Sequence, residues 1–241
     1  MNFTLSCRVR TLLITYILSI GSGLFSNVAN AQESFNFNTI NSKDGLSSNS
    51  LNAILKDRYG LMWFATDDGL NKFDGTQFTI YRHRSGDSTS LPSNEIVAVH
   101  EDRAGHLWLG TSGGALSLYD RKKDAFINFP AGNSDNTINN NVILSLCSDF
   151  NDILWIGNYA GVNLLNLKTN SVSKFLPAAN EPFIKTTLSL FQDSKHVMWI
   201  GTIDGLCSYD PATKKSSWYN HDEANETSLG GNVIRDRKSV V

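Results

Sequence analysis

Stretches of alternating apolar and polar residues, separated by short polar turns, run along the chain from about residue 46 to residue 219. They fall into groups of four. The first stretch of a group ends in an acid, and the second contains a tryptophan. The third has the order Gly-apolar-x-x-apolar-Asp in its clearest copies, and the fourth is short and aromatic. Such lengths and alternation are typical of β-strands. The pattern therefore predicts an all-β protein built from four-stranded units.

The second strand of each unit repeats a four-residue pattern of Trp, apolar, small, and Thr or Asn. Its tryptophans lie at positions 63, 108, 155 and 199, which are 45, 47 and 44 residues apart. Both faces of this strand are apolar, with Met62 and Phe64 on one and Trp63 and Ala65 on the other. Sheets buried on both sides that repeat at this spacing are typical of a β-propeller. An ordinary β-sandwich is the alternative. The small residues at 65, 110, 157 and 201 are expected where blades crowd together.

Turn residues separate the expected strands. Asp57-Arg58-Tyr59-Gly60 and Asp102-Arg103-Ala104-Gly105 place Asp first and Gly fourth, as a type I turn favours. Asp152 and His196 replace this Gly in later units, and both residue types tolerate the left-handed region. Glycines 69, 114, 161 and 205 lie between the second and third strands, where we expect a positive φ. The second unit has one extra residue there, which predicts a longer turn.

Residues 1–31 have the features of a secretory signal. Arg8 and Arg10 precede an apolar stretch over 11–25, and Ala29-Asn30-Ala31 forms a small-x-small cleavage pattern before Gln32. We therefore expect cleavage between Ala31 and Gln32 and a mature chain outside the cytoplasm; an uncleaved anchor is the alternative. No later apolar run approaches the ~18–20 residues that a membrane helix requires.

Composition excludes several functional classes. A net charge of −2 gives no basic footprint for nucleic acid. After the leader only Cys147 and Cys207 remain, at non-equivalent places in their repeats, so a disulfide framework is not expected. The five histidines show no common phase and no metal-ligand spacing. We expect no metal site, no cofactor and no catalytic residue in this chain.

The two ends of the repeat array interrupt the pattern. Residues 35–40 resemble the fourth strand of a blade, and Leu229-Gly230-Gly231-Asn232 resembles the segment that opens each earlier unit. The pattern breaks at Asp236. We therefore expect a partial propeller over 32–235, with blades at about 46–81, 91–129, 138–176 and 184–219 and the start of a fifth. Residues 236–241 are expected to be a truncated, non-native tail. The alternative is a natural four-blade arc that oligomerises into a ring.

These repeats resemble the two-component regulator propeller repeat. The resemblance rests on the opening Leu-x-x-Asn, the strand ending in acids, the Gly-x-Leu-Trp-Ile-Gly-Thr-like strand and the following Gly-Leu-x-x-Tyr-Asp. Residues 102–120 and 199–210 match best, whereas the third unit departs with Asn158 and Asn166. The resemblance implies the N-terminal periplasmic sensor part of a Bacteroidetes-type hybrid sensor histidine kinase. It also implies seven-bladed rings, a homodimeric parent in the inner membrane and, as ligands, breakdown products of polysaccharides.

Candidate binding residues lie in loops, because the turns between second and third strands and the arms between blades share one face of a propeller. Arg82, His83 and Arg84 in the first arm and Tyr159 in the third turn suit an oligosaccharide or acidic ligand. Membrane contact is expected only through C-terminal parts outside this chain. The alternatives are part of a secreted propeller enzyme, such as a lyase or glycan hydrolase, and a protein-binding scaffold. The loops carry no paired carboxylates in equivalent positions, which favours the sensor.

Overall fold

The structure is a computed structural model that describes residues 39–177 and 184–235. The expected signal, its cleavage site at Ala31 and Gln32, and the expected non-native tail at 236–241 lie outside the described residues. So does most of the strand expected over 35–40. The chain divides into Met1–Thr39 and Ile40–Val241, and the description below concerns the second unit.

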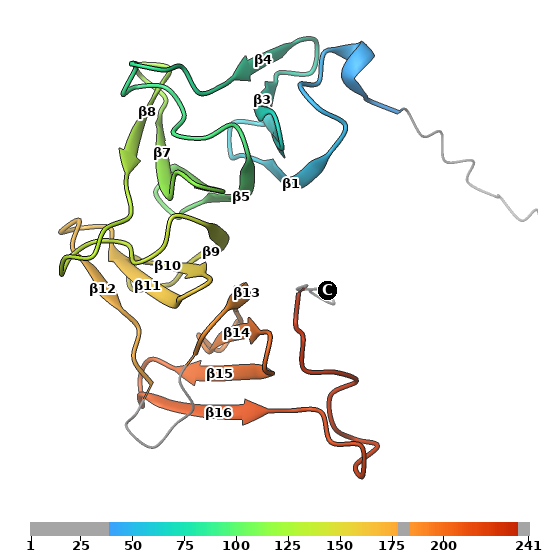
Figure 1. Ribbon diagram of the computed structural model, residues 1–241, viewed down its shortest axis with the longest axis vertical. Helices are drawn as coiled ribbons and strands as arrows, with labels where there is room; N and C mark the ends of the chain where they lie inside the picture. Colours follow the sequence, from blue (N-terminus) through green and yellow to red (C-terminus); the bar gives the residue numbers. More distant parts are fainter. Residues whose placement is uncertain (1–38, 178–183, 236–241) are drawn as a thin grey trace, which may run out of the picture. The chain divides into compact units, whose positions relative to one another are not determined.

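Among the described residues, sixteen strands form four antiparallel sheets, each with its strands side by side in chain order (Figure 1). A short 3-10 helix, η1 (Ser42–Asp44), precedes them. Blade 1 contains β1 (Leu51–Lys56), β2 (Met62–Thr66), β3 (Gly69–Phe73) and β4 (Phe78–Tyr81). Blade 2 contains β5 (Ile96–Glu101), β6 (Leu107–Thr111), β7 (Leu116–Asp120) and β8 (Ala125–Phe129).

Blade 3 contains β9 (Ile143–Ser148), β10 (Ile153–Asn158), β11 (Gly161–Asn166) and β12 (Val172–Lys174), and blade 4 contains β13 (Thr187–Gln192), β14 (Met198–Thr202), β15 (Leu206–Asp210) and β16 (Lys215–Tyr219). Every repeated tryptophan lies in the second strand of its blade. The all-β propeller architecture expected from the sequence is confirmed.

The acid at the end of each first strand binds the tryptophan of the second, an arrangement that we name the Asp–Trp clamp. The indole Nε1–H donates to one carboxylate oxygen in all four blades: Trp63 to Asp57 (2.9 Å), Trp108 to Asp102 (2.9 Å), Trp155 to Asp149 (3.0 Å) and Trp199 to Asp193 (2.9 Å). The other carboxylate oxygen accepts turn N–H groups, as Asp149 does from Asn151 (2.8 Å) and Ile153 (3.0 Å). These acids therefore have two roles: they close the turns, as expected, and they bind the tryptophans of the second strands.

Left-handed backbone occurs at most of the expected turn positions. Asp152 (φ 60°) and His196 (φ 67°) adopt it where earlier blades have glycine. The expectation for Gly114 is wrong: in the longer turn of blade 2 the positive φ falls on Gly113 (95°) and Ala115 (61°). With the extra residue in this turn, the positive φ values fall on the residues before and after Gly114. Sequence spacing alone did not reveal this.

Apolar packing joins each blade to the next. Three buried clusters each draw residues from two neighbouring blades; Trp63, for example, packs with Ile96 and Leu107 of blade 2. Trp63, Trp108 and Trp155 are at most 3% exposed. Trp199 of blade 4 is only half-buried. The tryptophans of blades 1 to 3 thus fill the junction with the blade that follows.

The small residue after each tryptophan permits this junction. A Cβ on Gly110 would lie 2.7 Å from Ile143 Cγ2, one on Gly157 would lie 2.8 Å from Thr187 Cγ2, and one on Gly201 would lie 2.7 Å from the Ile234 carbonyl oxygen. The expectation that blades crowd at these positions is confirmed.

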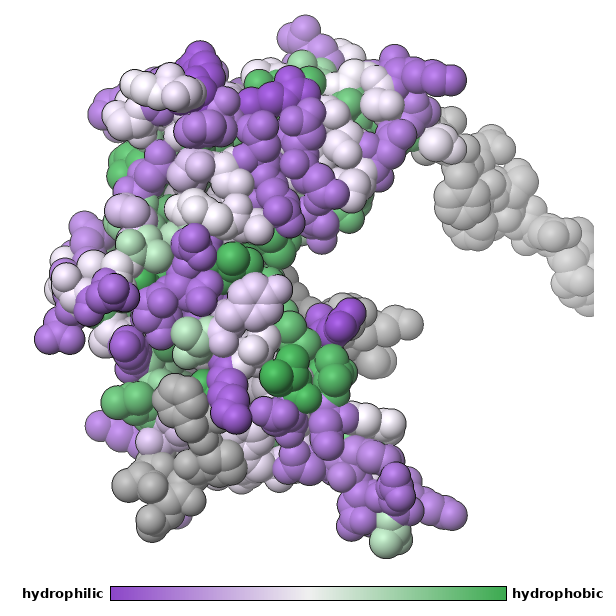
Figure 2. Space-filling model, in the orientation of Figure 1, coloured by the Kyte–Doolittle hydropathy of each residue, from purple (hydrophilic) through white to green (hydrophobic). Residues whose placement is uncertain are grey.

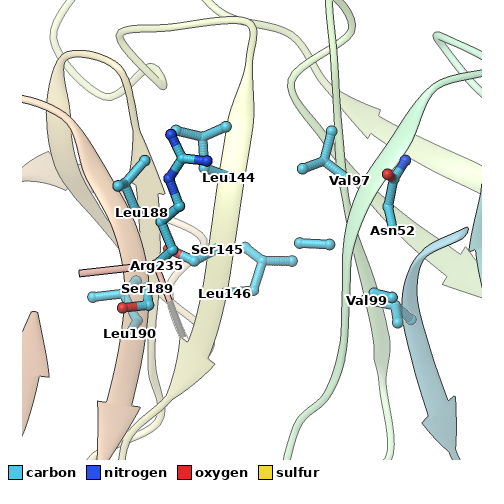
Figure 3. Close-up of a pocket in the computed structure, with 12 residues that line it drawn as sticks. Asn52, Val97, Val99, Leu144, Ser145, Leu146, Leu188, Ser189, Leu190 and Arg235 are labelled. Carbon is cyan, nitrogen blue, oxygen red and sulfur yellow. The ribbon is translucent and has the colours of Figure 1, made fainter. Parts of the chain in front are cut away.

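The first strand of every blade carries a β-bulge at the same place. The register of β1, β5, β9 and β13 against the second strand skips one residue, which is Asn52, Val97, Leu144 and Leu188 in turn. These four residues line an axial cavity of about 200 Å³. Arg235 lines the same cavity, and Figure 3 shows it beside Leu144 and Leu188. A bulge bends its strand and increases the local twist, and here the four skipped residues all face one cavity.

Removing one carboxylate oxygen from a clamp should destabilise the fold. In Asp149→Asn the amide can still accept the two turn N–H groups, but its NH₂ group then faces the buried indole N–H of Trp155. We expect the free energy of unfolding to fall by about 1–3 kcal/mol, the cost of an unpaired buried donor. Urea denaturation measures this change.

Asp120→Asn is the matched control. Asp120 Oδ1 accepts the turn N–H groups of Lys122 (3.0 Å) and Lys123 (3.2 Å), and its Oδ2 lies 3.7 Å from the exposed ammonium of Lys123, a surface pair of little energetic weight. In blade 3, Asn166 already makes the corresponding turn bonds. This control should leave stability unchanged. Equal losses in the two variants would show that the indole bond is not what matters.

Acid should weaken the clamps. Burial by itself raises the pKa of Asp57, Asp102 and Asp193, but hydrogen bonds from the tryptophans and turn N–H groups outweigh it, so each pKa lies below the ordinary 3.8. A pKa lower in the folded than in the unfolded state contributes stability above the unfolded pKa, and this is lost as the pH falls through the folded pKa. We therefore expect the urea midpoint to drop below about pH 4. A midpoint that rises on acidification would contradict this.

Adding a methyl group at a blade junction should also destabilise the fold. In Gly110→Ala the new Cβ meets Ile143 Cγ2 at 2.7 Å and Ala98 Cβ at 3.2 Å. We expect a loss of about 1–3 kcal/mol from overpacking, measured by thermal unfolding. Gly230→Ala is the control, because its Cβ would meet nothing within 4 Å. A neutral Gly110→Ala would mean that the blades can separate freely.

Candidate functional site

The turns between second and third strands and the arms between blades lie on one face, which we name the loop face. Gly69 N in the first turn donates to Asn94 O in the first arm (2.7 Å), and Gly113 N donates to Asn141 O (2.9 Å). Asn220 Nδ2 of the fourth arm donates to Asp204 O (2.6 Å). Each arm is thus tied to the turn of the blade that it leaves.

His83 belongs to a recurring structural motif. Its N–H donates to Asn94 Oδ1 (2.7 Å), and its Nδ1 lies 2.8 Å from Leu91 O. His221 makes the same two contacts, with Asn232 Oδ1 (2.7 Å) and Leu229 O (2.5 Å). The expectation that the histidines share no phase is therefore wrong for this pair. Residues 81–94 and 219–232 both begin with Tyr-x-His and end with Thr-Ser-Leu-x-x-Asn. Aligning these two segments would have revealed the shared position of the two histidines.

Arg82 and Arg84 are both paired with acids of the loop face. Arg82 Nη2 lies 2.8 Å from Asp68 Oδ2, and Arg84 Nη2 lies 2.7 Å from Asp87 Oδ2. Both arginines line a cavity of about 360 Å³ together with Tyr81. Their positive charges are balanced before any ligand binds.

A polar cluster that the sequence did not reveal lies beside this cavity. The Asp124 carboxylate accepts hydrogen bonds from the hydroxyls of Tyr81 and Tyr119, and Lys72 Nζ lies 3.5 Å from the same oxygen. The ammonium also lies 5.2 Å from the centre of the Tyr81 ring and 6.0 Å from that of Trp63. Lys72 stands where the other third strands have Leu118, Leu164 and Ser208. This irregularity was the available signal.

At neutral pH the carboxylate of this cluster is charged and its two phenols are protonated. Burial, followed by the hydrogen bond to Asp124, raises the pKa of Tyr119 to about 12, and the same two causes raise that of Tyr81. Burial raises the pKa of Asp124, but hydrogen bonds from Tyr119 and Tyr81 and the charge of Lys72 outweigh it and lower the pKa. A carboxylate held by two protonated phenols clasps blade 1 to blade 2.

Tyr159 lies in a different cavity, of about 450 Å³, between the loops of blades 3 and 4. Its side chain is 54% exposed, and the apolar Leu176 and Ile203 beside it are 68% and 40% exposed. Lys174 and Lys185 also line this cavity. The structure therefore does not bring Tyr159 together with Arg82 and Arg84. Figure 2 shows that the visible surface is mostly polar, with separate apolar patches.

Asn139 connects this cavity to a second one. It lines both the Tyr159 cavity and a neighbouring cavity of about 580 Å³, whose walls include Gly113, Gly132 and Asn140. Asn139 N donates to Asn163 Oδ1 (3.3 Å), and Asn139 Oδ1 accepts from Asn158 Nδ2 (3.2 Å). The loop face thus has two adjoining hollows that share one fixed amide side chain.

Two kinds of feature are absent from the described part of the chain. Over residues 39–177 and 184–235, no three His, Cys, Asp or Glu side chains are grouped so that they could hold a metal ion. No helix within those same ranges is long and apolar enough to cross a membrane.

Fold and repeats together define the class of protein, a β-propeller with an open loop face. Residues 45–68 and 90–113 match the family model described as "Two component regulator propeller". The chain therefore carries two-component regulator propeller repeats, as the sequence resemblance implied.

The proteins to which this chain is similar are much longer than the chain itself. Over 72 residues it is 49% identical to "Histidine kinase P4" of Formosa agariphila, a match that covers 28% of this chain and 5% of that protein. Among solved structures, it is similar to the extracellular domain of a protein of B. thetaiotaomicron described as a hybrid two-component system. The TM-score is 0.59 at 22% identity, covering 76% of this chain and 32% of that one.

A second solved structure gives the same picture. The extracellular domain of a B. thetaiotaomicron protein described as a one-component system matches with a TM-score of 0.64 at 22% identity, over 84% of this chain and 25% of that one. At this identity the likeness shows the fold alone. The chain spans a third or less of each of these relatives.

Proposed function

We propose that this chain is a ligand-sensing propeller of a two-component system, working outside the cytoplasm and without catalysis of its own. The observation that carries the proposal is the match to two-component regulator propeller repeats. The shared fold with extracellular domains of signalling proteins supports it. The expected signal at 1–31 fits a periplasmic location.

The whole protein, in this proposal, is a homodimeric histidine kinase of the inner membrane whose kinase parts lie beyond these repeats. Similarity to a histidine kinase supports this assignment. Further blades complete the ring, for which we propose seven in total. Ile234 N already donates to Thr202 O (2.9 Å), and Gly201 packs on Ile234 as Gly110 packs on Ile143. A fifth blade on this side would cover the half-buried Trp199.

The ligand in this proposal is a small oligosaccharide released from a polysaccharide. An exposed tyrosine with apolar neighbours and nearby amides suits a sugar ring, which has an apolar face and a hydroxyl edge. Of the four residues expected to bind, Tyr159 combines an exposed side chain with apolar neighbours and has no ion pair to open. Arg82 and Arg84 are proposed as secondary contacts, since their ion pairs must first open. The structure supports a structural role for His83.

Oligosaccharide binding tests this function. We expect a panel of oligosaccharides to include one that binds the purified chain saturably in isothermal titration calorimetry and is recovered intact afterwards. Tyr159→Ala should abolish the heat of binding, whereas Tyr59→Ala, which removes a similarly exposed ring from the opposite face, should not. If no oligosaccharide binds, the sensor proposal fails; if the ligand is recovered cleaved, the chain belongs to an enzyme instead.

A further inference from the structure

We propose that the Tyr159 cavity selects an acidic oligosaccharide, whose carboxylate or sulfate group lies between Lys174 and Lys185. This inference rests on the proposed function for the sugar nature of the ligand. It adds the charge of the ligand, the side chains that recognise that charge and the direction in which the sugar chain extends.

The charge of the cavity is the first argument. Lys174 and Lys185 are exposed, and neither forms an ion pair within residues 39–177 and 184–235. The described residues that line the cavity include no carboxylate. The cavity of Arg82 and Arg84 differs, because each of those arginines has its own aspartate. Two ammonium groups at one cavity with no carboxylate among its described lining residues favour an anion.

The shape of the cavity is the second argument. Val162 and Phe175, which are 3% and 8% exposed, form a buried apolar floor. The exposed side chains of Tyr159 and Ile203 line the same cavity and offer an apolar surface of a kind that stacks on a pyranose face. The Thr186 hydroxyl donates to Tyr159 O (3.4 Å), which helps to hold the tyrosine loop. A simple inorganic anion would leave this apolar surface uncovered.

The adjoining hollow is the third argument. Asn139 uses its N–H and its Oδ1 in contacts with Asn163 and Asn158, and its Nδ2 group makes no hydrogen bond in the described part of the chain. A free amide donor therefore lies at the boundary between the two hollows. A sugar held at Tyr159 can extend past Asn139 toward Gly132 and Asn140. We therefore infer a ligand of at least two sugar units.

The test compares matched ligands by isothermal titration calorimetry on the purified chain. The probes are a trimer of galacturonic acid, the same trimer as its neutral methyl ester, and a sulfated tetrasaccharide of carrageenan type. We expect the acidic trimer or the sulfated probe to bind at least about tenfold more tightly than the neutral ester. Which of the two binds distinguishes a carboxylate from a sulfate ligand. Binding of the acidic probe should weaken as salt is added.

Charge-removing variants then locate the site. Lys174→Gln and Lys185→Gln should each reduce acidic-probe affinity about tenfold and leave weak binding of the neutral ester unchanged. Lys122→Gln, an exposed lysine of the opposite face, is the matched control. All three lysines are exposed, so the midpoint of thermal unfolding should be the same in each variant as in the unaltered chain. That result would show that each variant folds.

The outcomes separate the two proposals. Equal affinity for acidic and neutral trimers, or no effect of the two lysine variants, would overturn the acidic site and leave a sensor of neutral sugars. Absence of binding by any oligosaccharide would overturn both. Binding of the acidic probe that survives Tyr159→Ala but not the lysine variants would show an anion site without sugar recognition, which also contradicts the inference.

Discussion

The Asp–Trp clamp is the interaction on which the rest of the structure depends. One carboxylate oxygen closes the turn between the first two strands, and the other holds the indole of the second strand. Because that indole fills the junction with the next blade, a single acid couples a local hairpin to packing between blades. A buried carboxylate is tolerated there because both of its oxygens are satisfied. Repeating this unit stacks the blades without any metal or disulfide among the described residues.

The features that recur in every blade leave variation to the residues around them. The clamps, the small residues at blade junctions and the bulges of the first strands recur in every blade, so they distinguish no blade from another. What differs lies outside those features. Lys72 and Asp124 clasp blade 1 to blade 2, whereas Tyr159, Lys174 and Lys185 open a cavity near blade 4. Recognition is therefore expected where the repeat is broken, because only there does one blade present chemistry that the others lack.

Sequence reasoning found the features that follow from local pattern. Asp152 and His196 adopt the left-handed conformation expected from their place in the turn. Gly110, Gly157 and Gly201 pack where blades meet. It failed where one residue was inserted, as at Gly114, and where two distant segments had to be compared, as for His83 and His221. It named Arg82 and Arg84 as candidate binding residues but did not reveal their ion pairs with Asp68 and Asp87.

The sequence by itself determined that this chain forms four propeller blades, because strand period, turn residues and the tryptophan repeat are encoded within each unit of about 45 residues. Tertiary structure alone decided which polar groups remain available. Lys72 meets Asp124 across 52 positions of chain, and Asn139 meets Asn163 across 24. Such pairs depend on how blades are set against one another. Whether a charged side chain serves the fold or a ligand is therefore settled by its neighbours in space, which no local pattern specifies.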